Sequence, residues 1–259
     1  MNGHRNRPLW SALAGIAAFL LIWQAATSVF AISEWLLPSP WQVAKEAFVS
    51  ADRVWMHSQS TAMLAAGGFA LSVAMGLLCA VLLHLFPLLR ELAQPFLILS
   101  QSVPSIVLAP LLVLWLGFGI MPKLVIIVLV CFFPVLIAAL GGFAQADRTM
   151  LQYLQMIGSS RLQIFRKLEF PGALPALFSG LRISATYSIT GAVIAEWLGA
   201  EKGIGVYMTL ASSSYRADRV FVAIGVIVAL SLLLFGLVQV LERYLIPWNR
   251  KGGRGKVHE

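Results

Sequence analysis

The chain has 259 residues, of which 59% are hydrophobic and only 12% charged, and its formal net charge at pH 7 is +8. Soluble domains contain roughly 45–50% apolar residues, so this composition, with a mean hydropathy of +0.84, excludes an ordinary soluble protein. The positive charge accompanies no nucleic-acid motif with interleaved aromatic residues. We therefore expect the basic loops to face the anionic headgroups of a lipid bilayer and not nucleic acid.

Six apolar segments are long enough to cross about 30 Å of hydrocarbon as helices, which takes roughly 20 residues each. In chain order they lie near residues 9–30, 61–86, 92–116, 124–143, 174–198 and 220–241. Only the fifth contains formally charged side chains, which are Arg182 and Glu196. The sequence therefore predicts an all-α, polytopic membrane protein with about six transmembrane helices in one transmembrane domain at residues 9–248.

Both ends of the chain are expected to lie outside the membrane. Arg5 and Arg7 precede the first apolar segment, which raises the alternative of a signal peptide. That segment exceeds the roughly 7–15 residues of a signal core, and no small-residue cleavage site follows before Glu34. We therefore expect a retained span after an N-terminal segment at residues 1–8. Residues 249–259 are basic and rich in glycine, which predicts a disordered tail.

A short helix is expected between the first two spans. Pro38, Ser39 and Pro40 predict that it begins at Trp41. Its apolar side would consist of Val43, Ala44, Ala47 and Phe48, with Lys45 and Glu46 opposite. We expect this helix to lie along the outer membrane interface, with Trp35 and Trp41 as anchors.

Polar residues in the third and fifth spans mark a candidate translocation path. Gln101 and Ser102 lie beside Pro104. A proline costs roughly 3 kcal/mol in an ordinary helix interior, but is tolerated where neighbours or a wet cavity satisfy the freed carbonyl. Tyr187 is the largest residue of a second polar set in the fifth span. The alternative for both sets is helix packing, because small and hydroxylated residues let membrane helices approach and hydrogen-bond.

A polar, basic loop at about residues 147–171 separates the fourth and fifth spans. Its apolar residues are spaced as in two short amphipathic helices, with Gly158 where the backbone must turn or pack closely. Such a hairpin has an apolar face that needs a protein partner. The alternative is an ordinary basic loop between membrane spans.

The two charged residues of the fifth span are further candidates, since a charge at the bilayer centre costs at least about 2.5–3.5 kcal/mol. Arg182 lies near the inner end of the span, where we expect an inner-gate or structural role. Glu196 lies near the outer end. We expect it either to line the translocation path or to form an ion pair with Lys202 or Arg216 at the outer rim.

Lysine and arginine are unevenly distributed between alternate loops. Six lie in one set of loops, namely Lys45, Arg53, Lys123, Lys202, Arg216 and Arg219. Twelve lie in the other set, namely Arg5, Arg7, Arg90, Arg148, Arg161, Arg166, Lys167, Arg243, Arg250, Lys251, Arg254 and Lys256. Because cytoplasmic loops carry the excess of basic residues, both termini and the Gly158 loop are predicted to be cytoplasmic.

No residue set in the sequence predicts catalysis or a bound metal. Cys79 and Cys131 lie in separate apolar spans, so neither a disulfide framework nor a metal site is indicated. The segment at residues 199–205 lacks the spacing and the following hydroxyl of a phosphate-binding loop. We expect no enzymatic activity and no cofactor bound by this chain itself.

The Gly158 loop resembles the cytoplasmic loop of bacterial ABC importer permeases, whose pattern is Glu-Ala-Ala, three residues, Gly, nine residues, Ile-x-Leu-Pro. Gly158 and Pro171 fall on the glycine and the proline of that pattern, and Leu168 and Phe170 on its two apolar positions. The opening triplet departs from it, because it is Gln-Tyr-Leu at residues 152–154.

Further landmarks over residues 36–248 resemble the nitrate, sulfonate and taurine permease group of the ABC importers. They are Leu-Pro-Ser-Pro at 37–40, Gln-Ser-Val-Pro at 101–104, Trp-Leu-Gly-Phe-Gly at 115–119, Phe-Phe-Pro at 132–134 and Ser-Gly-Leu-Arg at 179–182. Within that group, residues 191–199 and 214–218 look most similar to permeases for thiamine precursors such as hydroxymethylpyrimidine.

This resemblance implies the permease subunit of an ATP-driven importer in a bacterial inner membrane. A second permease copy, two ATPase subunits that use ATP and Mg²⁺, and an external substrate-binding protein are the implied partners. The residues assigned to ATPase coupling are Gln152, Leu154, Ile157, Gly158, Arg161, Phe165 and Pro171. The solute would be a thiamine-precursor pyrimidine or a nitrate, sulfonate or taurine-type anion. An ion-coupled secondary carrier and a non-transporting membrane scaffold are the alternatives.

Overall fold

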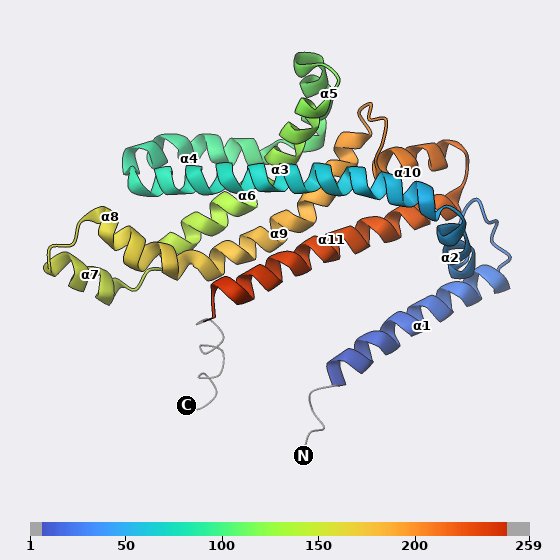
Figure 1. Cartoon of the computed structure of the whole chain (residues 1–259), viewed down its shortest axis with the longest axis horizontal. Coiled ribbons are helices and arrows are strands. Elements are labelled where there is room, and N and C mark those ends of the chain that lie inside the picture. Colours follow the sequence, from blue (N-terminus) through green and yellow to red (C-terminus); the bar gives the residue numbers. More distant parts are fainter. Residues whose placement is uncertain (1–6, 248–259) are drawn as a thin grey trace.

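The computed structural model describes residues 7–247, and all regular elements in this range are helices, which confirms the predicted all-α class (Figure 1). The tail at residues 249–259 and most of the N-terminal segment at residues 1–8 lie outside the described residues. The elements are α1 Arg7–Val29, α2 Pro40–Val49, α3 Ala51–Leu85, α4 Pro87–Ser102, α5 Ser105–Leu116, α6 Ile120–Ala144, α7 Arg148–Met156, α8 Arg161–Ile164, the π-helical turn η1 Phe165–Glu169, α9 Phe170–Glu196, α10 Ile204–Ser213 and α11 Ala217–Leu245.

Helix α9 lies at the centre of the bundle, where it packs against α6, α11, α3 and α10. Its sides are therefore more extensively buried than those of the other long helices described. The short helices gather at the two ends of this bundle: α7 and α8 lie at one end, and α2 and α10 at the other (Figure 1). This arrangement separates a coupling end, which holds the predicted hairpin, from an opposite end, which holds the predicted outer elements.

Three described helices, α3, α6 and α11, are long and apolar enough to cross a membrane by themselves. Helices α4 and α5 form a fourth candidate if they are counted as one broken span. The apolar part of α1 at Ala14–Val29 is shorter, and the polar residues of α9 reduce its mean hydropathy. The chain is thus a multi-pass helical membrane protein, while the count of six spans stays a prediction.

The segment expected as the third span is not one helix. Helices α4 and α5 meet at 98° (Figure 1), on either side of Val103 and Pro104. Proline lacks the N–H for a helical hydrogen bond and pushes the residue before it into an extended conformation. Val103 accordingly has φ −91° and ψ 116°, so the helix ends at Ser102. The third predicted span, at residues 92–116, is therefore broken beside Pro104, the proline expected to disturb an ordinary helix.

Helices α6 and α9 approach closely because small residues lie between them. A Cβ atom added to Gly180 would lie 2.4 Å from the Cβ of Ala138 and 2.6 Å from the carbonyl oxygen of Pro134. One turn further along α9, the Ser184 hydroxyl donates to the carbonyl of Cys131 at 2.7 Å, and the Cys131 thiol donates to the carbonyl of Ser184 at 3.3 Å. Small residues that allow close approach, and hydrogen bonds between helices, commonly stabilise the association of membrane helices.

We expect Gly180→Ala to destabilise the bundle by about 1–3 kcal/mol, because the added methyl group overpacks the contact between α9 and α6. Gly172→Ala is the matched control in the same helix, since a Cβ there meets no atom within 4 Å. Thermal unfolding of the purified variants in detergent measures the difference. Equal melting temperatures for both variants would contradict the proposed close packing.

Candidate functional site

The hairpin at the coupling end is built by local capping interactions. The Asp147 side chain accepts hydrogen bonds from the backbone N–H groups of Thr149 and Met150, at 2.8 and 3.1 Å, and so begins α7. Ser160 begins α8 through a capping box with Gln163. Between the two helices Gly158 has φ +77°, a left-handed conformation that glycine adopts without strain. The predicted turn at Gly158 is therefore confirmed.

The hairpin exposes several large apolar side chains among the polar and basic residues of its surface. The exposed apolar side chains are Met150, Tyr153, Met156, Ile157 and Leu162, and Met156 reaches 78% exposure. Of the residues assigned to coupling, Gln152, Ile157, Gly158 and Arg161 are exposed, whereas Leu154 and Pro171 are half-buried. An exposed patch of this kind on a structured loop indicates a protein interface.

Phe165, which was also assigned to coupling, is buried at 7% exposure and points into the bundle. Its ring contacts the rings of Phe143 on α6 and Phe170 on α9, with centroids 5.2 and 5.8 Å apart. The ring of His84 from the end of α3 lies 5.7 Å from it. Phe165 therefore fixes the hairpin to the bundle and is not part of the exposed patch.

A polar joint that the sequence analysis missed lies beside this aromatic cluster. His84 Nε2 lies 2.7 Å from Glu169 Oε2, and each side chain is only 15% exposed. Arg161 Nη2 donates to the backbone carbonyl of His84 at 2.8 Å. The two residues of the pair are 85 positions apart in the sequence, so no local spacing signal connects them.

The residues predicted for the third-span part of the path lie at the break between α4 and α5. Ser102 is exposed and its hydroxyl donates to the carbonyl of Ile98, Pro104 is exposed, and the side chain of Gln101 lies outside the described part of the chain. Tyr187, on α9, is 48% exposed. Helix α4 packs on α3, whereas α9 packs chiefly on α6 and α11. On the other side of the break, Ile106 of α5 lines a hollow of about 340 Å³ together with Thr190 of α9, so the path assignment stays a prediction.

Arg182 forms an ion pair with Glu242 of α11, which the sequence analysis did not anticipate. The side chains are 26% and 16% exposed, so the pair is partly shielded. It joins α9 to α11, and each charge balances the other inside the bundle. Removing one partner would leave an uncompensated charge there.

Glu196 is 1% exposed and pairs with neither Lys202 nor Arg216, so the expected rim ion pair is wrong. Its Oε1 accepts a hydrogen bond from the Thr61 hydroxyl, and its Oε2 accepts one from the backbone N–H of Gly205, both at 2.8 Å. The same hydroxyl oxygen of Thr61 accepts a hydrogen bond from the backbone N–H of Ile204 at 2.8 Å. This clamp fixes the beginning of α10 to α3 and α9.

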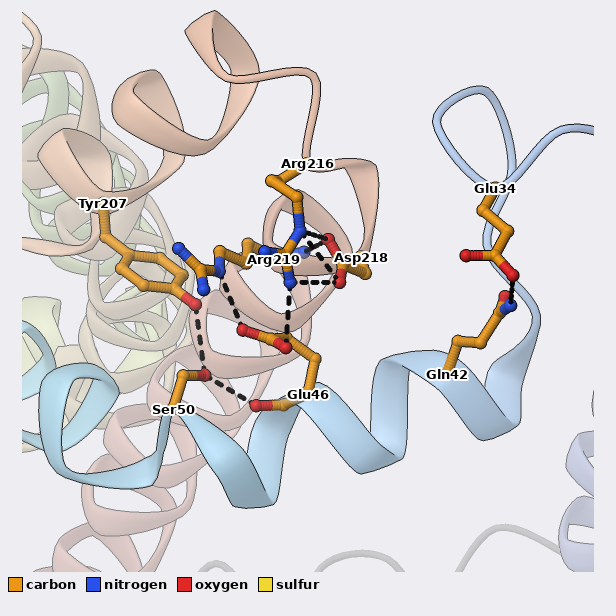
Figure 2. Close-up of polar contacts among 8 residues, drawn as sticks. All are labelled: Glu34, Gln42, Glu46, Ser50, Tyr207, Arg216, Asp218 and Arg219. Atoms are coloured by element: carbon orange, nitrogen blue, oxygen red, sulfur yellow. Dashed lines mark hydrogen bonds and ion pairs between the residues drawn. The ribbon is translucent and has the colours of Figure 1, made fainter.

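A second polar network fixes α2 to the corner between α10 and α11 (Figure 2). Glu46 accepts a 2.7 Å hydrogen bond from Arg219 and lies 3.0 Å from Arg216, which also contacts Asp218 at 2.7 Å. Hydrogen bonding to Asp218 raises the pKa of Arg216, so its guanidinium stays charged. The network borders a hollow of about 530 Å³ that is also lined by Glu34, Trp35, Lys45 and Tyr215.

Helix α2 begins at Pro40, one residue before the predicted start, with Ser39 as its N-cap. Its position along the outer interface stays a prediction, and the structure shows which of its side chains face the protein. Glu46 is buried at 8% exposure, whereas Trp41 and Phe48 are 73% and 84% exposed. Glu46 faces the protein because the two arginines of the network compensate its charge, whereas Lys45, on the same predicted side, is exposed.

Comparisons with known proteins match this architecture to transport components. Residues 72–246 match the family model described as "Binding-protein-dependent transport system inner membrane component". The chain is 34% identical over 231 residues to a Haemophilus influenzae "Probable ABC transporter permease protein", which covers 89% of this chain and 94% of the relative. It is 31% identical over 233 residues to the "Formylaminopyrimidine transport permease protein ThiX" of Halalkalibacterium halodurans, covering 90% and 93%. It is 28% identical over 251 residues to the "Taurine transport system permease protein TauC" of Escherichia coli, covering 94% and 91%.

We expect Thr61→Val to destabilise the protein by about 1–3 kcal/mol, because the Glu196 carboxylate and the Ile204 N–H each lose a partner in a buried site. The side chains are nearly isosteric, so lost packing contributes little. Thr190→Val, at an exposed position of α9, is the matched control. Thermal unfolding compares the two variants, and a Thr61→Val protein as stable as the control would show that the clamp contributes nothing.

Proposed function

This chain belongs to the family of binding-protein-dependent transport system inner membrane components, and from that premise we propose that two copies form the solute path of an ATP-driven importer. The chain is a permease subunit of an ABC transporter and a transport subunit, not an enzyme. Its partners include an ATPase and a substrate-binding protein. The copy numbers, the pairing of two identical permeases and the inner membrane of a bacterial cell are parts of the proposal.

The exposed apolar patch of the hairpin is the observation that carries this function. Met156 and Ile157 lie on a structured turn in the loop most enriched in basic residues, where lipid does not cover them under the predicted topology. The partner that the family provides for this patch is the ATPase subunit, and the hairpin would bind in a groove of that subunit. ATP and Mg²⁺ would bind to that subunit, and its closure would move the hairpin as a rigid body together with the helices attached to it.

The solute path is proposed to form between two permease copies. Tyr187 and Thr190 are exposed on α9 although α9 is the central helix of the bundle. A hydroxyl facing hydrocarbon lacks a hydrogen-bond partner, so this face is better suited to a second copy or to a wet cavity. Ser102 and Pro104, at the break after α4, would also line this path, either in the same permease copy or from the second copy. Arg182, whose ion pair with Glu242 joins α9 to α11, lies on α9 nearer the hairpin than Tyr187, as an inner gate would.

A small solute delivered by the external protein is the proposed cargo. The similarity to a formylaminopyrimidine permease supports a thiamine-precursor pyrimidine, and the similarity to a taurine permease supports a sulfonate or a related anion as the second candidate. An ion-coupled carrier is less well supported, because Glu196, the one carboxylate within the predicted spans, is occupied by Thr61 and Gly205. A membrane scaffold would have no use for the exposed hairpin patch.

The predicted topology places both termini and Arg161 in the cytoplasm, and Trp41 and Tyr215 outside. Single cysteines at residues 41, 161 and 215, in a background with Cys79→Ala and Cys131→Ala, test it with a membrane-impermeant maleimide on intact and permeabilised cells. The three positions are exposed in the structure, so each should react where reagent is present. Labelling of residue 161 in intact cells would overturn the topology.

Gly158→Val tests the coupling assignment. No atom lies within 4 Å of a Cβ built on Gly158, so the valine is disfavoured by its left-handed backbone and not by crowding. We expect near-normal membrane abundance but at least a ten-fold loss of ATP hydrolysis stimulated by the binding protein. Uptake of radiolabelled hydroxymethylpyrimidine and of taurine into proteoliposomes is measured separately. Uptake by the wild-type complex distinguishes the two candidate cargoes, and in Gly158→Val the uptake of the transported solute should fall in parallel with ATP hydrolysis.

Gly158→Asn is the control, since asparagine tolerates the left-handed conformation far better than a β-branched residue. It should retain most of the stimulated ATP hydrolysis. Wild-type coupling in Gly158→Val would refute the role of the hairpin. Absence of ATP-driven uptake by the wild-type complex with any solute that its binding protein holds would refute the importer.

A further inference from the structure

The hairpin is covalently continuous with only two of the long helices. The chain enters α7 from α6 and leaves η1 into α9, so movement of the hairpin reaches these helices directly. Helix α3 has no such connection, because it ends at Leu85 and continues into α4. Any displacement of α3 by the hairpin must therefore pass through noncovalent contacts.

Helix α3 packs along α6 and α9, but the polar contacts that the structure describes between the hairpin itself and α3 converge on one residue, His84, in the last turn of α3. Its Nε2 lies 2.7 Å from Glu169 Oε2 in η1, and its backbone carbonyl accepts a 2.8 Å hydrogen bond from Arg161 of α8. Its ring lies 4.9 Å from the ring of Phe143 and 5.7 Å from that of Phe165. The hairpin therefore holds the end of α3 by a side-chain hydrogen bond, a hydrogen bond to a backbone carbonyl and the aromatic contact of Phe165, while Phe143 of α6 adds a second aromatic contact.

The opposite end of α3 is held by a second polar contact. Thr61 bonds both the Glu196 carboxylate at the end of α9 and the backbone N–H of Ile204 at the beginning of α10. Residues 61 and 84 belong to one uninterrupted helix, so they are separated by roughly 35 Å at 1.5 Å per residue. Helix α3 thus runs as a single rod from the hairpin to the elements at the far end of the bundle.

We propose that His84 and Glu169 are positioning residues that transmit the movement of the coupling hairpin to α3 and, through it, to the Thr61 clamp. This inference rests on the proposed function, because it needs an ATPase that moves the hairpin. The hydrogen bond does not require one charge state, since Nε2 donates both in the protonated ring and in the neutral Nε2–H tautomer. Arg161 of α8 stabilises the same contact, because its guanidinium lies at the C-terminus of α3, where a positive charge is favourable.

Nucleotide-dependent labelling at the far end of α3 tests this transmission without knowledge of the solute. Met63 is 75% exposed on α3, and Trp197 is 46% exposed just beyond α9. Single variants Met63→Cys and Trp197→Cys, in the background without native cysteines, are made in the complete complex with its ATPase subunits. The rate of reaction with a water-soluble maleimide is measured without nucleotide and with ATP plus vanadate.

We expect trapped nucleotide to change the reaction rate at both positions at least three-fold in the otherwise unaltered complex. His84→Leu should reduce the change at position 63 at least two-fold relative to the change at position 197, because α9 remains covalently attached to the hairpin whereas α3 retains only its packing on α6 and α9 and the Thr61 clamp. His84→Gln, which keeps a hydrogen-bond donor, should restore most of the response at position 63. Glu169→Leu should resemble His84→Leu, and the double variant should be no worse than either single variant, as expected for two residues that act as one unit.

Several results would overturn the inference. A full response at position 63 in His84→Leu would show that α3 moves without the joint. Equal loss at positions 63 and 197, or loss of the ATPase subunits from the complex, would show that His84 only maintains the hairpin. Equal defects in His84→Leu and His84→Gln would show that the hydrogen bond is not the transmitting element. If the unaltered complex shows no response at either position although its ATPase subunits remain bound, the proposed function fails and the inference fails with it.

Discussion

Every polar group that this chain carries into the membrane must find its partner inside the protein, because hydrocarbon offers none. The consequences are visible throughout the bundle. Glu196 is enclosed by Thr61 and the N–H of Gly205, and Arg182 is balanced by Glu242. The Ser184 hydroxyl is satisfied by the carbonyl of Cys131. Each of these contacts joins two different helices, so the requirement that satisfies the polar groups also fixes the relative positions of the helices.

Local features of the sequence predicted the local features of the structure. The spacing of apolar residues and the glycine at residue 158 were sufficient for the hairpin, because caps and turns are formed by neighbours in the chain. The start of α2 after Ser39 follows from the same kind of signal. Hydropathy predicted apolar helices that the structure confirms in α3, α6 and α11, and Pro104 predicted irregular backbone in the third span but not the 98° bend of the break at Val103. The sequence signal for that break was present in Pro104, which excludes an ordinary helix and restricts the residue before it.

Partners distant in the sequence could not be predicted in the same way. Glu196 was expected to choose a nearby cation, yet its partners are a hydroxyl 135 positions away and a backbone amide. His84 and Glu169 occur in separate segments whose own patterns are apolar and basic, and nothing in either pattern points to the other. Glu46 seemed to belong on the wet side of an amphipathic helix because the arginines that compensate it lie beyond α10. In each case tertiary contacts decide whether a polar side chain faces inward.

Tyr187 is a polar side chain that is exposed and does not face the interior of the bundle. A half-exposed tyrosine on the central helix, near an exposed Thr190, cannot have its hydroxyl satisfied by lipid tails. The faces of α3 and α11 that are exposed carry chiefly apolar side chains and are suited to lipid, so the face of α9 differs from them in chemistry and not only in exposure. Water or a second protein surface must therefore cover it in the functional assembly. The constraint that explains the contacts within one chain thus also applies to this face of α9, whether water or another protein surface meets it.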